Sequence, residues 1–307
     1  MWKAALIIFL TVFFAVVAAG AGYAYYLYNE ASENVEKMNQ NYTEEVGIPV
    51  EARRNSLRGS VSFLIAGIGD RPGEPGLADV IMAVSINPDD ESMLLFNIPR
   101  DTQVSIPGRN KPEKINHAYS YGGMKLVKET AEQKLQHSFD FVMEANMQGF
   151  QEIVDTLGGV EVDNAFAFSQ NNVGNTKTHH YDKGLIELNG ERALDYVRMR
   201  KKDPRGDLGR NERQQQVLKA LLQKTRSVEN LLNGQDMLNI LGENVKTNMT
   251  MDDIRTLFTS YRSALNYTRS FELEGENDTQ DGVSYYLVSE QEWQKASLRL
   301  ENHQKKQ

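Results

Sequence analysis

Apolar residues gather in a few continuous runs along the chain, and the first run is the longest. Residues 4–28, AALIIFLTVFFAVVAAGAGYAYYLY, contain no charged side chain. A helix rises about 1.5 Å per residue, and about 20 apolar residues are enough to cross a bilayer core. The run therefore predicts a transmembrane signal-anchor over residues 1–28. Lys3 precedes the run, which indicates an N-terminus inside the cell and the bulk of the chain outside it.

A cleaved signal peptide is the alternative interpretation of this run. The small residues Ala18-Ala19-Gly20-Ala21 provide a suitable cleavage site. Under either interpretation the rest of the chain works outside the cytoplasm. Residues 29–58 are polar with few large apolar side chains, which is typical of a stalk. We expect one folded domain over residues 59–305, with a motif-bearing core at 61–222 and a C-terminal part at 223–305.

The remaining pattern mixes strands with helices. Continuous apolar runs predict strands covered on both faces, and the turn Asn87-Pro88-Asp89-Asp90 predicts a hairpin or short loop between two of them. The expected strands are 61–68, 80–86, 93–98, 160–162 and 283–288. The expected helices are 124–137, 148–157, 190–199 with Asn189 as its cap, 210–226, 251–265 and 290–300. Such a mixture indicates an α/β or α+β sandwich.

The helix expected at 210–226 is the most clearly amphipathic, because Val217, Leu218, Leu221 and Leu222 fall on one face.

Composition narrows the classes of function. The chain has 42 acidic and 34 basic residues and a net charge of -8, which argues against a nucleic-acid partner. It has no cysteine, which excludes disulfides, thiolate metal sites and cysteine nucleophiles.

One segment reverses this acidic balance. Residues 196–213 read YVRMRKKDPRGDLGRNER, in which seven basic side chains stand against three acids. Five of the seven are arginines, whose planar guanidinium groups match pairs of phosphate oxygens. Arg198 and Arg200 would share one face of an extended stretch. The segment predicts a phosphate site, and a solvated basic loop is the alternative.

A second group of charged residues stands at the ends of the expected strands. Asp70 and Arg71 follow the first strand, Asp79 precedes the second, and Arg100 and Asp101 close the third. Ligand sites of α/β proteins form at such sheet rims. The two carboxylates Asp70 and Asp79 flank the loop RPGEPGLA, and together they predict a site for Mg²⁺. Ordinary turn capping by the aspartates is the alternative.

Two further polar stretches are candidates for a phosphate site and a metal site. Lys114 opens the stretch KINHAYSYGG and could face a phosphate, although a lone lysine is more often a surface residue. The pair His179-His180 lacks a third ligand and any metal-site spacing, so we expect a surface loop there.

In their order and spacing these segments resemble the LytR-CpsA-Psr family of cell-envelope phosphotransferases. The segments that carry the resemblance lie between about residues 61 and 222: GIGDRPG, the aspartate at position 79, IPRDT, KINHAYSYGG, RMR and GDLGRNERQQQV. The chain departs from the family's patterns at two places. The family commonly has G-x-D-x-R where this chain has GIGDR, and R-S-D-T where it has LADV. Asp70 is thus displaced by one position.

The resemblance implies an α/β fold with a central mixed β-sheet flanked by helices, an α-β-α sandwich with an apolar channel for a prenyl chain. Core strand residues such as Leu64, Phe96 and Ile98 could line that channel, although such residues are more often plain core.

The implied activity is transfer of a glycopolymer, such as wall teichoic acid or capsule, from a polyprenyl-pyrophosphate carrier to the 6-hydroxyl of muramic acid in peptidoglycan. The implied location is the cell membrane of a Gram-positive type of cell, single-pass, with the domain facing the wall. A membrane lipid and peptidoglycan are then partners. A binding module for the pyrophosphate lipid and a hydrolase of it are alternatives. A transcription attenuator has little support, because the chain lacks a helix-turn-helix signature.

The resemblance also assigns roles to single residues. The expected pyrophosphate contacts are Arg100, Arg198, Arg200 and Arg210, the expected assisting residues are Lys114, Arg213 and Gln214, and Arg71 could compensate for an arginine missing beside Asp79. Asp79, with Asp70, is the expected ligand of Mg²⁺ or of Mn²⁺ in its place. The sugar hydroxyl must lose a proton, and Asp207 is the expected base because it lies among the arginines. Asp70 and Asp203 are alternatives for that role.

Overall fold

A computed structural model describes residues 42–48, 57, 59–69, 76–224 and 244–305, together with six single residues between 26 and 39. Most of the expected membrane anchor and of the expected stalk, and both Asp70 and Arg71, lie outside the described residues. Within the described part, no helix has the length and apolar character needed to cross a bilayer.

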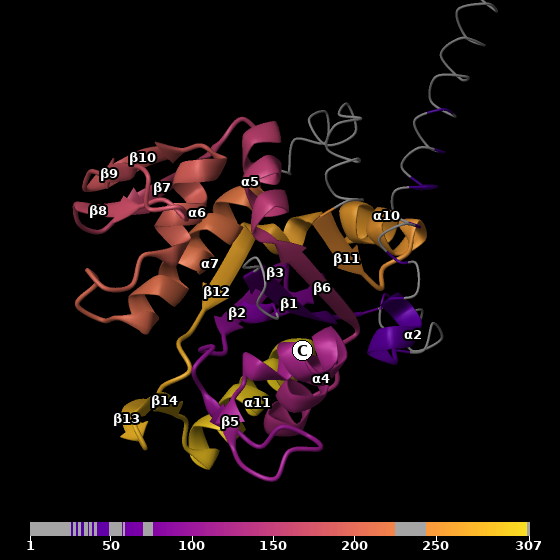
Figure 1. The fold of residues 1–307 in the computed structure, drawn as a ribbon. Coiled ribbons are helices and arrows are strands. Elements are labelled where there is room, and N and C mark those ends of the chain that lie inside the picture. The colour runs from indigo at the N-terminus through magenta and orange to yellow at the C-terminus, as the bar shows by residue number, and fades with distance from the viewer. Residues whose placement is uncertain are drawn as a thin grey trace, which may run out of the picture.

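The centre of the fold is a six-stranded sheet (Figure 1). In spatial order the strands are β11 (Val245–Thr247), β6 (Phe141–Asn146), β1 (Val61–Gly69), β2 (Leu77–Asn87), β3 (Ser92–Asn97) and β12 (Tyr267–Ser270). Strands β1–β2, β2–β3 and β6–β11 pair antiparallel, whereas β1–β6 and β3–β12 pair parallel, so the sheet is mixed as expected.

The hairpin between β2 and β3 forms at the expected turn. The side-chain oxygen of Asn87 accepts hydrogen bonds from the backbone N–H groups of Asp89 (3.0 Å) and Asp90 (3.1 Å). This Asx-type turn sets the register in which Asn87 faces Ser92. Every residue of β3 is buried, as a strand covered on both faces requires.

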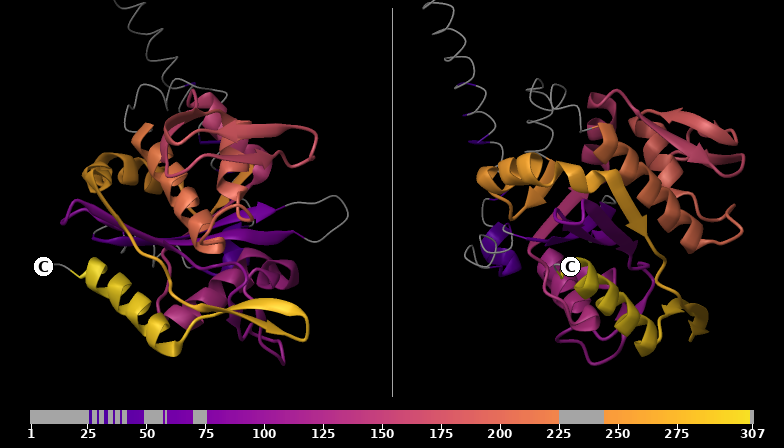
Figure 2. Two further views of the ribbon diagram at one scale, coloured as in Figure 1. Left: turned by 90° about the vertical axis from the view of Figure 1, so that its left-hand side faces the viewer. Right: turned by 180° about the vertical axis from the view of Figure 1, so that it is seen from behind.

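Helices cover both faces of the sheet, which gives three layers (Figure 2). On one face α4 (His117–Leu135) and α11 (Glu290–Gln304) pack on β2, and the short α2 (Tyr42–Val46) joins them. This core contains the fully buried Leu64, Phe96 and Ile98 together with Trp293. On the other face lie α7 (Asp207–Lys224), α10 (Met251–Ser260) and the 3₁₀ turn η1 (Arg262–Asn266).

A second, smaller core lies beyond α7. It is enclosed by α5 (Met147–Thr156), α6 (Gly190–Arg198), β7 (Val160–Asn164), β8 (Phe168–Asn171), β9 (Thr178–Tyr181) and β10 (Gly184–Leu188). The rings of Phe168, Tyr181 and Tyr196 pack together at its centre. Helix α7 serves both cores, because Val217 packs into this one and Leu218 packs against the sheet.

Most expected elements form, with shifted bounds. The helix expected at 124–137 begins earlier, at His117, and is kinked at Gly122 and Gly123. The helix expected at 251–265 ends at Ser260 and continues as η1. The smaller strands β4 (Gln103–Val104), β5 (Glu113–Lys114), β13 (Glu276–Gln280) and β14 (Val283–Leu287) complete the described elements. The central strand β6 was not expected.

Candidate active site

Charged side chains from four separate segments meet where β2 and β3 approach the loop between α6 and α7. The Asp101 carboxylate is the meeting point, because three cations approach it from three segments. Its oxygens lie 3.0 Å from Lys114 Nζ on β5, 3.7 Å from Arg200 Nη1 in the α6–α7 loop, and 4.0 Å from Arg100 Nε beside it.

Two further carboxylates extend this arrangement. Arg100 forms an ion pair with Asp79 of β2. Asp207, the first residue of α7, pairs with Arg200 through one oxygen and with Arg210 Nη2 at 2.7 Å through the other. The connected set is called the strand-end network below; its members are Asp79, Arg100, Asp101, Lys114, Arg200, Asp207 and Arg210.

Backbone hydrogen bonds hold the Asp101 turn in place. The Thr102 N–H donates to the Pro99 carbonyl (2.9 Å), and the Ile115 N–H donates to the Thr102 carbonyl (2.9 Å). The Tyr286 N–H of β14 donates to the Asp101 carbonyl (2.9 Å). The turn is therefore clamped by β5 on one side and by the C-terminal hairpin on the other, so the C-terminal part also contributes to the site.

Burial and charge act against each other within the network. Burial lowers the pKa of the Arg100 guanidinium, but the charge and hydrogen bond of Asp79 and the charge of Asp101 outweigh it, so the pKa is raised. Burial raises the pKa of the Asp101 carboxyl, but Lys114, Arg100 and Arg200 outweigh it, so the pKa is lowered. Burial lowers the pKa of Arg210 to about 10 despite Asp207. The ionised forms of these groups thus depend on one another.

Arg213 and Gln214 lie in the same region, but their polar groups point to protein partners. Arg213 Nη1 donates to Asp203 Oδ2 (2.6 Å), and Nη2 donates to the Met199 carbonyl. The side-chain carbonyl oxygen of Gln214 accepts a hydrogen bond from Asn97 Nδ2 (2.8 Å) at the end of β3. These contacts fix the loop that carries Arg200 against the sheet.

Arg198 and Arg200 have different partners. Arg198 is the last residue of α6. Met199, which lies between the two arginines, has an extended backbone conformation. Arg198 Nη1 lies 3.6 Å from Asp195 Oδ1, one helical turn earlier, whereas Arg200 pairs with Asp101 and Asp207. Within the described residues, Arg198 Nη1 is buried and donates no hydrogen bond, and about one third of the Arg198 side chain is exposed.

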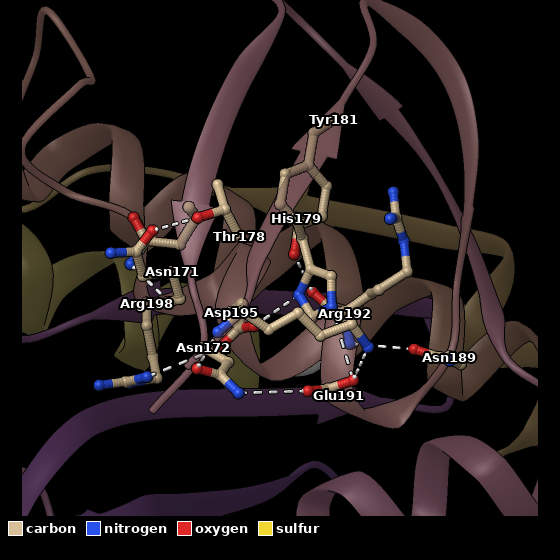
Figure 3. A network of polar contacts seen from close by, with 12 residues as sticks. Asn171, Asn172, Thr178, His179, Tyr181, Asn189, Glu191, Arg192, Asp195 and Arg198 are labelled. Atoms are coloured by element: carbon tan, nitrogen blue, oxygen red, sulfur yellow. Dashed lines mark hydrogen bonds and ion pairs between the residues drawn. The ribbon is translucent and has the colours of Figure 1, made fainter. Parts of the chain in front are cut away.

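The expectation that His179 lies in a surface loop is wrong. It belongs to β9, its side chain is buried, and its Nδ1 lies 2.8 Å from Asp195 Oδ2 (Figure 3). His180 is exposed. Alternation along the strand places His179 and Tyr181 on the inner face. Sequence reasoning assigned no role to Asp101 or Asp195; the signal for Asp195 was its position one turn before Arg198.

The described carboxylates do not form an all-protein metal cage. Within the described segments, no group of three or more histidine and carboxylate side chains is arranged to hold a metal. One Asp79 oxygen pairs with Arg100, and the other lies where a Cβ on Gly69 would clash with it. Gly69 thus leaves room for this carboxylate. Mg²⁺ commonly takes one or two carboxylates and completes its shell with substrate phosphates and water.

Comparison with known proteins places this arrangement in one family. The LytR_cpsA_psr family model matches residues 22–302. A protein of Oceanobacillus iheyensis named polyisoprenyl-teichoic acid--peptidoglycan teichoic acid transferase TagU is 37% identical over 296 residues, which cover 94% of this chain and 90% of the relative. The crystal structure of B. subtilis TagV is 31% identical with a TM-score of 0.70, covering 80% of this chain and 97% of that one. A structure of TagT bound to LIIa-WTA is 31% identical with a TM-score of 0.68, covering 81% and 92%. The chain belongs to the LytR_cpsA_psr family.

Proposed function

We propose that this chain is a glycopolymer–peptidoglycan phosphotransferase. It moves an anionic glycopolymer, such as wall teichoic acid, from a polyprenyl-pyrophosphate carrier to the 6-hydroxyl of a muramic acid residue in peptidoglycan. The names of its relatives support this substrate class, since one is a teichoic acid transferase and another was solved with LIIa-WTA bound.

The strand-end network is the observation that carries the proposal. Four cations, Arg100, Lys114, Arg200 and Arg210, converge on one edge of the sheet in a chain whose net charge is -8. Three of them are arginines, whose paired donors match phosphate oxygens. A local basic site in an acidic protein can bind the compact diphosphate group of the carrier although the net charge of the chain is negative.

The reaction is a displacement at phosphorus. The muramic acid oxygen forms a bond to the phosphorus that bears the glycopolymer, the bond from that phosphorus to the bridging oxygen breaks, and prenyl monophosphate leaves. Negative charge spreads over the phosphate oxygens in the transition state. Arg100, Arg200 and Arg210 neutralise that charge, and this electrostatic stabilisation lowers the barrier of the reaction.

The proton of the attacking hydroxyl needs an acceptor, and Asp207 takes this role in the proposal. Its two oxygens face Arg200 and Arg210. A bound diphosphate competes with the carboxylates for the same guanidinium groups. When Arg200 turns to the phosphate, the Asp207 oxygen that it contacted becomes free to accept the hydroxyl proton.

A divalent cation and the membrane complete the proposal. Asp79, together with Asp70, would hold Mg²⁺ or Mn²⁺, and the cation would supply further neutralisation of phosphate charge. Residues 4–28 anchor the protein in the cell membrane, with the N-terminus inside and the domain facing the wall, because the run is uncharged and Lys3 precedes it. The anchor keeps the site near its lipid-linked donor.

The test is a transfer assay on the full-length protein in detergent. The donor is a polyprenyl-pyrophosphate-linked glycopolymer, and the acceptor is a peptidoglycan oligomer. Arg100→Ala should lower transfer at least a hundredfold, on the scale of losing one preorganised charge donor. Arg255→Ala is the matched control, since Arg255 is an exposed residue of α10 outside the network. Full activity of Arg100→Ala would refute the assigned role.

Product analysis separates this activity from the other two considered. Polymer joined to glycan supports transfer, polymer released to water indicates a hydrolase, and unchanged donor indicates a binding module. A parallel reaction in chelator should lose activity and regain it on addition of Mg²⁺. Full activity in chelator would remove the metal from the proposal.

A further inference from the structure

A buried polar pair lies directly behind Arg198, outside the strand-end network. Figure 3 shows His179 of β9 and Asp195 of α6 pointing toward one another beneath the β8–β9 hairpin. Only 6% of the His179 side chain and 1% of the Asp195 side chain are exposed. Burying two ionisable groups costs free energy unless each group satisfies the other, so a pair buried this deeply indicates a structural or functional role.

Asp195 bridges His179 to Arg198. Its Oδ2 lies 2.8 Å from His179 Nδ1, and its Oδ1 lies 3.6 Å from Arg198 Nη1 (Figure 3). A carboxylate oxygen only accepts hydrogen bonds, so His179 carries its proton on Nδ1. The two oxygens of one carboxylate therefore face a histidine from the strand and an arginine from the helix.

The charge of Asp195 depends on these two neighbours. Burial raises the pKa of the Asp195 carboxyl, and the hydrogen bond from His179 and the charges of His179 and Arg198 oppose that shift. The same helix also buries Leu194, Tyr196 and Val197. Without the His179 donor, the ionised form would lose its one described hydrogen bond.

The outer side of the His179 ring faces a second carboxylate. Its Nε2 lies 3.5 Å from Glu191 Oε2 in the first turn of α6, and that carboxylate pairs with Lys177 Nζ at 2.9 Å. The Asn172 amide contacts the same glutamate (3.5 Å). The imidazole ring thus lies between the carboxylates of two residues of one helix, and its hydrogen bond to Asp195 orients it.

We propose that His179 is a positioning residue for the transfer reaction: through the Asp195 carboxylate it holds the Arg198 guanidinium at the angle at which its other donors meet the diphosphate of the lipid carrier. This inference rests on the proposed function. Arg198 is the last residue of α6, so no further turn of this helix follows it to hold its side chain in place. An arginine held by charge on one side keeps its other donors for a ligand.

The test compares variants of His179 in two backgrounds of the full-length protein. His179→Leu removes the donor to Asp195, and His179→Gln keeps an amide that can donate. The matched control is His180→Leu, the exposed neighbour on the same strand. The two measurements are the dissociation constant for polyprenyl pyrophosphate by titration calorimetry and the KM and kcat of transfer. Circular dichroism melts check that each variant folds.

We expect His179→Leu to weaken donor binding about tenfold, on the scale of a charged hydrogen bond, and His179→Gln to recover most of it. His180→Leu should match the parent protein. In an Arg198→Lys background, His179→Leu should add much less than tenfold, because both changes disturb the same contact.

Several outcomes would overturn the inference. The first is full donor affinity and full kcat in His179→Leu. The second is an equal loss with and without the Arg198 change, which indicates general loosening of the fold. A His179→Leu variant that does not fold leaves the comparison to His179→Gln and Asp195→Asn. Folded, fully active Asp195→Asn would then overturn the inference. Absence of transfer by the parent protein would instead refute the proposed function.

Discussion

The buried pair of Arg213 and Asp203 gives the sharpest stability prediction. Arg213 Nη1 donates to Asp203 Oδ2 at 2.6 Å, and the exposed fractions of the two side chains are 6% and 1%. The Arg213→Met change keeps the length and apolar stem of the side chain and removes its charge. It leaves the Asp203 carboxylate buried beside Gly209 with one remaining donor, the backbone N–H of Arg205 (2.8 Å).

The expected cost follows from the burial of the pair. Removing one partner of a buried ion pair costs about 3–5 kcal/mol, because the other charge stays uncompensated. The midpoint of thermal unfolding changes by about 2–4 °C per kcal/mol for a domain of roughly this size, so it should fall by roughly 6–20 °C. Neutralising the carboxylate as well, in the double variant Arg213→Met with Asp203→Asn, should recover part of the loss.

Circular dichroism melts of the full-length protein in detergent measure this effect. Arg255→Met is the control and should stay within about 0.5 kcal/mol of the parent, since Arg255 is exposed on α10. A midpoint lowered by less than about 2 °C in Arg213→Met, together with lost donor affinity, would refute the structural role and favour direct substrate binding by Arg213.

Three further changes test the packing of the fold and the pH dependence of its stability. Gly190→Ala should cost about 1–3 kcal/mol in urea unfolding, because its Cβ would clash with the Gln151 carbonyl where α5 meets α6. Trp293→Ala should cost about 3–5 kcal/mol by the same measurement, because the ring is fully buried beneath the sheet. Burial lowers the pKa of His303, so the unfolded chain binds this proton more readily than the folded one. Unfolding free energy should therefore decrease as pH falls below about 6.5, the unfolded value, and His303→Gln should reduce that pH dependence.

The fold could be predicted where burial follows the local pattern. The continuous apolar runs of β1 and β3 and the Asn87 turn are visible in the sequence, and the structure confirms them. Strand β6 could not be found this way, because Glu144 interrupts its apolar run. Its carboxylate pairs with Lys246 Nζ of β11 at 2.8 Å. Lys246 on the neighbouring strand satisfies that charge, and no sequence pattern around Glu144 predicts the pairing.

The candidate site divides in the same way. Charged residues at the ends of apolar strands are expected at the sheet rim, and Arg100 and Asp79 form an ion pair there. The central position of Asp101 depends on Lys114 and Arg200, which come from distant segments. The burial of His179 differs from the surface loop expected for the two adjacent histidines. The period of two in Thr178–Tyr181 already separated the inner histidine from the outer one.

The most direct test of the proposed activity is mass spectrometry of the glycan after reaction of the full-length protein with lipid-linked polymer and peptidoglycan oligomer. We predict a polymer joined by a phosphodiester to the muramic acid 6-hydroxyl, with prenyl monophosphate released in equal amount. The same product should be at least a hundredfold scarcer with Arg200→Ala, whose guanidinium links Asp101 to Asp207 at the centre of the strand-end network. Free polymer without a glycan linkage, or undiminished linkage by Arg200→Ala, would contradict the proposed mechanism.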